Sequence, residues 1–241
     1  KGDLEQAIVK YKQAIKIKPD FSEAYFNMSL TFNIEGNLEA AIESYKKAIE
    51  IKPDYSEAYF NMANILSNKG KLGAAIESYK QVIGLKPEHA QAHFNMGIAS
   101  KNKGNLEAAI ESYKQAIKIE PDYAEAHYYT GNVLSAKYDR ADSVGDLEAA
   151  IESYGRAIKI ESDNFQAYEG MSFWIRHYIW ARNNGLIMNL EKINHLIDLE
   201  RDKLKEKINT HPFWFIDITR TSSTAIKVAL GAKFGWPFGQ K

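Results

Sequence analysis

An eleven-residue segment begins at Gly36 and occurs again, unchanged, from Gly104. Close variants begin at Gly2, Gly70 and Gly145. The first four of these glycines lie 34 residues apart, and an insertion of seven residues precedes the fifth. A fixed period of this length is typical of one supersecondary unit stacked on itself. The repeats therefore determine the architecture of about three quarters of the chain, although they do not identify a ligand.

Each repeat predicts two helices, which residues 56–69 and 72–85 illustrate through apolar side chains at helical spacing. Gly70, between them, predicts a turn that leaves the first helix through a left-handed conformation. A proline closes each unit, and the aspartate after it is predicted to cap the next helix. The closing prolines are Pro19, Pro53, Pro87 and Pro121, and the aspartates are Asp20, Asp54 and Asp122.

Small residues recur where two helices must approach closely. They are Ala7, Ala41, Ala75, Ala109 and Ala150 in the second helices, and Ser29, Ala63, Gly97 and Gly131 in the first. With the recurring Tyr45, Tyr79 and Tyr113, the glycine turns and the closing prolines, this pattern resembles the tetratricopeptide repeat family. The resemblance extends over residues 1–182. It implies an all-α fold, a right-handed α-solenoid of helical hairpins whose first helices line a concave groove for peptides or partner proteins.

Two units depart from the repeat. Residues 138–144 add seven positions between two helices, which is about two helical turns. Either the first helix lengthens without rotating its buried face, or the insertion forms a bulged loop. In the unit that begins near Phe165, bulky side chains replace the usual small and polar ones, and we expect them to cover the end of the array. They are Phe173, Trp174, Tyr178, Ile179 and Trp180.

Composition excludes several classes of function. The 31 basic and 31 acidic side chains balance, so no net charge directs the chain to nucleic acid or to an anionic membrane. The sequence has no run of 18 apolar residues, and without cysteine it forms no disulfide. The compartment is left open, with the cytoplasm favoured. Because the chain begins at Lys1, partway through a repeat, we expect it to be a fragment of a longer protein.

Asparagines follow the repeat along the first helices and are candidate peptide ligands, because an amide both donates and accepts hydrogen bonds. Those at 34-residue intervals resemble the asparagine ladder in the repeat domain of O-linked N-acetylglucosamine transferase, although Tyr129 and Gly170 interrupt it. Alternatively, these are polar helix positions copied by duplication. The candidate residues are Asn27, Asn61, Asn95, Asn64 and Asn132.

One aromatic residue per unit precedes the asparagine position: Phe26, Phe60, Phe94 and Tyr128. The rings either form an apolar stripe beside the amides or pack between adjacent hairpins. A carboxylate clamp for chaperone tails needs lysine or arginine at these positions, so that mode is excluded. We therefore expect a groove for an extended, partly apolar peptide of a protein partner or for a neighbouring segment of the protein itself. Self-association through the incomplete first unit is a further hypothesis.

His89 and His93 have the spacing of two metal ligands on one helix face. Pro87 places His89 at a helix start, however, and no third ligand is evident nearby. His93 and His127 occupy the aromatic position that Tyr25 and Tyr59 hold, so packing roles are favoured and no metal is predicted.

After residue 182 the pattern changes. Residues 183–211 predict a connector helix, and residues 212–241 predict a strand, a hydroxyl-rich turn and a helix start. Such a turn favours anions through free N–H groups and the helix dipole. An ordinary strand-to-helix junction is the alternative.

The turn resembles the phosphosulfate loop of the sulfotransferase superfamily at Arg220, Thr221, Ser223 and Thr224. Ser222 replaces the usual glycine, and Thr219 replaces the usual proline. The resemblance implies that a larger parent protein could bind 3′-phosphoadenosine 5′-phosphosulfate there and act as a sulfotransferase. For this fragment we expect no turnover and no cofactor of its own.

Overall fold

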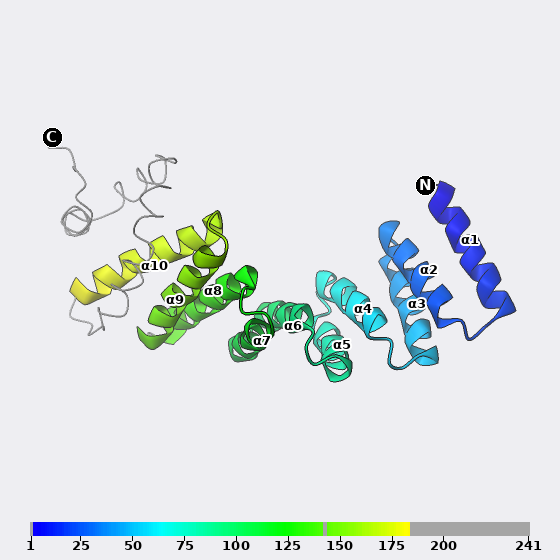
Figure 1. Ribbon diagram of the computed structural model, residues 1–241, viewed down its shortest axis with the longest axis horizontal. Helices are drawn as coiled ribbons and strands as arrows, with labels where there is room; N and C mark the ends of the chain where they lie inside the picture. Colours follow the sequence, from blue (N-terminus) through cyan, green and yellow to red (C-terminus); the bar gives the residue numbers. More distant parts are fainter. Residues whose placement is uncertain (1, 142–143, 184–241) are drawn as a thin grey trace. The chain divides into compact units, whose positions relative to one another are not determined.

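The computed structural model describes residues 2–141 and 144–183, in which the regular secondary structure is α-helical (Figure 1). The helices are α1 (Gly2–Ile17), α2 (Ser22–Ile34), α3 (Leu38–Ile51), α4 (Ser56–Asn68), α5 (Leu72–Leu85), α6 (Ala90–Asn102), α7 (Leu106–Ile119), α8 (Ala124–Ala141), α9 (Val144–Ile160) and α10 (Phe165–Asn183). The predicted helix pair at 56–69 and 72–85 is confirmed. The rest of the predicted connector and the strand, turn and helix of residues 212–241 lie outside the described residues.

The chain forms two compact units, Lys1–Pro121 and Asp122–Lys241. In the first, α2 packs with α3, α4 with α5 and α6 with α7, which gives three hairpins. Each hairpin also contacts its neighbour, through α3 with α4 and α5 with α6, and α1 packs on α2 (Figure 1). In the second unit α8 pairs with α9, and α10 packs on both. Each unit is therefore built by the predicted stacking of hairpins on their neighbours.

Glycine makes the turn within each hairpin of the first unit. Gly36, Gly70 and Gly104 have φ values of 78°, 71° and 88°, a left-handed conformation that a side chain disfavours. In two of these turns the next residue is an asparagine whose side chain caps the second helix. Asn37 accepts from the Ala40 amide and Asn105 from the Ala108 amide. The predicted left-handed turn is thus confirmed at all three glycines.

The variant that begins at Gly145 has no such turn, because α9 already begins at Val144 and this glycine lies within the helix. The insertion before it lengthens helices: α8 has 18 residues, whereas α2, α4 and α6 have 13 each. Of the two alternatives for the insertion, the longer first helix is the one observed over the described residues. No described helix is long and apolar enough to cross a membrane.

The predicted aspartate caps are wrong for α2 and α4. Their N-cap residues are Phe21 and Tyr55, and neither cap has a side-chain hydrogen bond. Asp20 lies one residue earlier, and its backbone carbonyl accepts a hydrogen bond from the Ser22 amide. The N-cap position carries an aromatic ring because it packs against the preceding hairpin: Tyr55 stacks on Phe26 with ring centroids 4.8 Å apart. Packing therefore outweighs capping at these two helix starts.

Buried tyrosines of the second helices form the centre of each hairpin. Tyr45, Tyr79, Tyr113 and Tyr154 are at most 1% exposed. Small residues of the first helices make room for them, as the spacing predicted. At Gly97 the fit is tightest in the first unit, since an added Cβ would lie 2.5 Å from Cε1 of Tyr113. In the second unit, Cβ atoms added at Gly131 and Gly170 would both meet the Tyr154 ring at 2.7 Å.

The aromatic side chains of α10 only partly meet the expectation that they cover the end of the array. Trp174 is buried, whereas Phe165 and Phe173 are 43% and 53% exposed. The side chains of Tyr178, Ile179 and Trp180 lie outside the described residues.

Two glycine-to-alanine substitutions separate packing from helix propensity. Gly97→Ala is expected to lower the free energy of unfolding by about 1–3 kcal/mol, because the Tyr113 ring must move. A Cβ added at Gly84 in α5 would meet no atom within 4 Å. Gly84→Ala is therefore expected to raise the free energy of unfolding by roughly 0.5–1 kcal/mol, because alanine favours the helix. Urea unfolding followed by circular dichroism measures both. Equal effects of the two variants would contradict this packing.

Candidate peptide-binding surface at the start of α6

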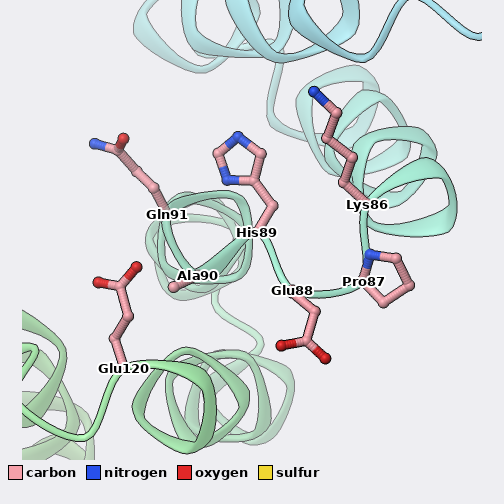
Figure 2. Close-up of a pocket in the computed structure, with 7 residues that line it drawn as sticks. All are labelled: Lys86, Pro87, Glu88, His89, Ala90, Gln91 and Glu120. Carbon is pink, nitrogen blue, oxygen red and sulfur yellow. The ribbon is translucent and has the colours of Figure 1, made fainter.

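An open pocket of about 540 Å³ lies in the first unit, where the chain passes from α5 to α6 (Figure 2). We call it the α5–α6 pocket. Its lining residues come from the connecting loop, the first turn of α6 and the end of α7: Lys86, Pro87, Glu88, His89, Ala90, Gln91 and Glu120. Gln91 occupies the same repeat position as Glu23 and Glu57, on the first helices that the sequence assigns to the binding surface. None of the asparagines and aromatic residues predicted to form the peptide groove lines this pocket, so the predicted groove stays a prediction.

His89 is held in the wall of this pocket by two contacts. Its Nδ1 accepts a hydrogen bond from the Ala92 amide at 3.3 Å, which caps α6. Its ring stacks on Phe60 of α4, with ring centroids 4.9 Å apart. Burial lowers the pKa of His89 below its ordinary value of 6.5, and the Lys86 cation lowers it further. The imidazole is thus held by its Nδ1 hydrogen bond and by its contact with the Phe60 ring.

Lys86 of the pocket forms an ion pair with Glu57 of α4, at 2.5 Å between Nζ and Oε1. The hydrogen bond from Lys86 lowers the pKa of the Glu57 carboxyl group. Both side chains are about half exposed, so the pair contributes little to stability. Its consequence for the pocket is that the Lys86 charge is already balanced by a carboxylate.

The aromatic residues predicted at this surface lie between hairpins. Phe26 packs edge-on to Tyr45 of its own hairpin and stacks on Tyr55 of the next. Phe60 makes the matching contacts with Tyr79 and His89. Phe94 packs on Tyr113, and in the second unit Tyr128 packs on Tyr154. These contacts favour the packing alternative, with Phe94 buried and the other three rings half-buried. A direct role in binding a ligand stays a prediction.

The predicted asparagine ligands are largely engaged inside the protein. The Tyr79 hydroxyl donates to Asn64 Oδ1 at 2.6 Å, and Asn95 Nδ2 donates to the same oxygen at 3.0 Å. This network joins α4, α5 and α6, so it connects one hairpin to the next. Burial raises the pKa of Tyr79 to about 12, and a hydrogen bond with Asn95 opposes part of the rise.

The other three asparagines differ in exposure. In the second unit Asn132 Oδ1 accepts from the Tyr154 hydroxyl at 2.8 Å. Asn61 is half-buried and interacts with the Tyr45 hydroxyl, which opposes the rise in the pKa of Tyr45 caused by burial. Asn27 is exposed on α2. Peptide binding by these amides stays a prediction, and Asn27 presents the most accessible one.

The spacing of tyrosines and asparagines in the sequence indicates the hydroxyl–amide network. Tyr79 lies 15 residues after Asn64 and 16 residues before Asn95, so it can reach the first helix of its own hairpin and that of the next. A buried tyrosine hydroxyl needs a hydrogen-bond partner. Asn64 and Asn95 supply amide groups for this hydroxyl, and an amide engaged in this way is less available to a ligand.

Metal ligation is not supported within the described ranges, where no group of three or more histidine and carboxylate side chains could hold a metal ion. His89 caps α6, and His93 is buried with its Nε2 3.1 Å from the Pro87 carbonyl oxygen. The packing role predicted for His93 is thereby confirmed. The sulfotransferase-like residues 220–224 lie outside the described residues, and their role stays a prediction.

Comparison with protein families identifies the repeats. A family model described as a TPR repeat matches residues 1–32, 30–70, 63–104 and 101–137, and a model described as a tetratricopeptide repeat matches residues 141–164. No match supports a sulfotransferase-like segment. A comparison with curated proteins gives no match.

Solved structures share the fold. A crystal structure of MamA is 26% identical, with a TM-score of 0.61 over 68% of this chain and 92% of that one. MamA from Desulfovibrio magneticus RS-1 is 20% identical, with a TM-score of 0.59 over 68% of this chain and 88% of that one. YrrB, described as a TPR protein with an unusual peptide-binding site, is also 20% identical. Its TM-score is 0.61 over 70% of this chain and 83% of that one.

Removing one hydroxyl tests the network between hairpins. Tyr79→Phe keeps the ring but removes the bond to Asn64, so the free energy of unfolding should fall by about 1 kcal/mol. Tyr59→Phe is the matched control, since the half-buried Tyr59 hydroxyl makes no hydrogen bond within the described residues. Chemical denaturation of both variants is the measurement. A loss for Tyr79→Phe no larger than for Tyr59→Phe would contradict the network.

His89 predicts a pH dependence of stability. Because its pKa is lowered in the folded state, its contribution is complete above the unfolded value of 6.5 and is lost as the pH falls below it. His89→Asn keeps a cap acceptor that does not titrate. The loss of stability between about pH 7.5 and about pH 5.5 should therefore be smaller in this variant than in the wild type. Identical losses in denaturant titrations at the two pH values would refute the assignment.

Proposed function

The chain belongs to the tetratricopeptide repeat family, and we propose that its repeat array binds an extended segment of a partner protein at the α5–α6 pocket. The observation that carries this proposal is the pocket itself, which lies where the chain enters a first helix of the array. Its polar walls offer hydrogen bonds, and the exposed Pro87 offers apolar contact. The fold class common to this chain and YrrB, whose description names a peptide-binding site, is consistent with the proposal.

The partner segment must bury apolar surface as well as form hydrogen bonds. A net hydrogen bond contributes about 0.5–1.5 kcal/mol, so a few amide contacts alone give millimolar affinity at best. The half-buried Phe60 and Phe26 rings present apolar edges next to polar positions of the same helices. An extended segment with alternating apolar and polar side chains fits this arrangement best.

Only some of the predicted asparagines are accessible to a peptide. Asn64 and Asn95 are joined to each other and to Tyr79, so their first task is to hold α4 and α6 in place. Asn27 on α2 is exposed and can meet a peptide backbone directly. Self-association through α1, on which Val9 is 53% exposed, stays a separate prediction.

A sulfotransferase parent is not needed for this function. The Arg220-containing turn and its 3′-phosphoadenosine 5′-phosphosulfate ligand stay predictions from the sequence. A scaffold whose repeat array recruits a partner accounts for the described residues without an enzymatic domain.

The proposal is tested with a phage-displayed library of random ten-residue peptides selected on the full chain. Enriched peptides, synthesised with a fluorescent label, should bind in solution by anisotropy. Gln91→Ala should weaken them by roughly 2- to 10-fold, the equivalent of one hydrogen bond. Gln81→Ala, on the exposed side of α5, is the matched control and should leave the affinity unchanged. No enrichment, or equal affinities for both variants, would contradict binding at this pocket.

A further inference from the structure

The charge pattern of the repeats reverses at the α5–α6 pocket. Lysine is the C-cap residue of α3 and α5, at Lys52 and Lys86, but Glu120 is the C-cap residue of α7. Each of these positions lies 29 residues after a first-turn residue of the preceding first helix. For Lys86 that residue is Glu57, to which it is bonded. For Glu120 it is the neutral Gln91, so the reversed charge has no complementary partner at that position.

Glu120 is unfavourable for the helix that it ends. A helix C-terminus carries partial negative charge, so a lysine there is stabilising and a glutamate is destabilising. Lys52 and Lys86 follow that rule, whereas Glu120 breaks it. The last turn of α7 already contains the cation of Lys118, but Glu120 forms no ion pair in the described part of the chain. A residue that departs from a local rule is a sign of a functional position. The carboxylate is therefore a candidate for contact with a partner.

The surroundings of Glu120 suit a cation. Figure 2 shows its side chain pointing from the end of α7 toward Gln91, with Ala90 between it and His89. Glu88 lines the pocket from the other side of the loop and adds negative potential. The N-terminus of α6 alone would favour an anion, but the His89 side chain already caps the Ala92 amide.

Aromatic residues at the position of His89 already hold cations elsewhere in the first unit. Lys18 Nζ lies 5.4 Å from the Phe21 ring centroid, and Lys52 Nζ lies 4.7 Å from that of Tyr55. At His89 the corresponding Lys86 bonds Glu57 instead. Phe60 stacks on the His89 ring, and Lys86 is not placed over the ring as Lys18 and Lys52 are over theirs.

We propose that the α5–α6 pocket binds an arginine side chain of the partner segment. The planar guanidinium donates a pair of hydrogen bonds to the Glu120 carboxylate and one to the Gln91 carbonyl oxygen, and it lies against the His89 ring. Its methylene groups contact Pro87. This inference rests on the proposed peptide-binding function and names the side chain that the pocket selects.

The test uses two fluorescein-labelled ten-residue peptides of alternating valine and serine, with a central arginine in one and its uncharged isostere citrulline in the other. Anisotropy titrations are made with the full chain, with Glu120→Lys and with Glu111→Lys. Glu111 is exposed in the middle of α7, so its variant has the same change in net charge away from the pocket. The wild type should bind the arginine peptide about tenfold more tightly than the citrulline peptide.

Glu120→Lys should abolish that preference, and Glu111→Lys should keep it. Because lysine suits the C-terminus of α7, Glu120→Lys should also raise the melting temperature by about 1–4 °C, which separates lost binding from lost folding. Equal affinity of the wild type for both peptides, or a preference that survives Glu120→Lys, overturns the arginine site and leaves the peptide-binding function standing. If neither peptide binds, the arginine site is overturned. If the phage library also yields no enriched peptide, the proposed peptide-binding function is overturned as well.

Discussion

The buried tyrosine of each second helix, packed against a small residue of the first, is the contact on which the hairpins depend. Tyr45, Tyr79, Tyr113 and Tyr154 are almost completely buried. A ring of this size fits between two helices only where the facing side chain is short, as at Gly97, where even a methyl group would meet the ring. This packing fixes the distance between the two helices of a hairpin. The hydroxyl of Tyr79 then reaches Asn64 and connects with Asn95 of the next hairpin.

The same contacts limit where a ligand can bind. Side chains that join hairpins are not free to meet a partner, which applies to the inner faces of Phe26 and Phe60 and to the amides around Tyr79. The surface that we propose for recognition lies at the ends of the helices, where the chain passes from one hairpin to the next. There the α5–α6 pocket differs from its equivalents through His89, Gln91 and Glu120. On this proposal, small changes at the repeat ends would give the site its specificity, while the interior stays periodic.

Much of the fold could be predicted from the sequence because it follows from spacing. Glycine at 34-residue intervals predicts left-handed turns, and Gly36, Gly70 and Gly104 adopt them. The prediction from the repeat is wrong where helix capping and aromatic packing compete for one position. Asp20 and Asp54 are good capping residues, yet the N-cap positions hold Phe21 and Tyr55, because aromatic packing between hairpins contributes more there. Gly145 begins a similar segment but lies inside a helix, since α9 already begins at Val144.

The candidate site was predictable only in part. Spacing placed asparagines and aromatic rings on the first helices, but it did not reveal that tyrosine hydroxyls engage Asn64 and Asn132. The change from lysine to glutamate at Glu120 is visible in the sequence. Its meaning depends on the side chains that surround it, which the fold brings together from α5, α6 and α7.

The central claim is that a partner segment binds at the start of α6. Nuclear magnetic resonance of the ¹⁵N-labelled chain tests it most directly, because each backbone amide reports its own surroundings. On addition of the arginine peptide, the account predicts that the amide signals of Ala90, Gln91 and Glu120 shift together and saturably, while those of Lys46 and Glu77 on exposed faces of α3 and α5 do not. Saturable shifts that leave Ala90, Gln91 and Glu120 unchanged would contradict it.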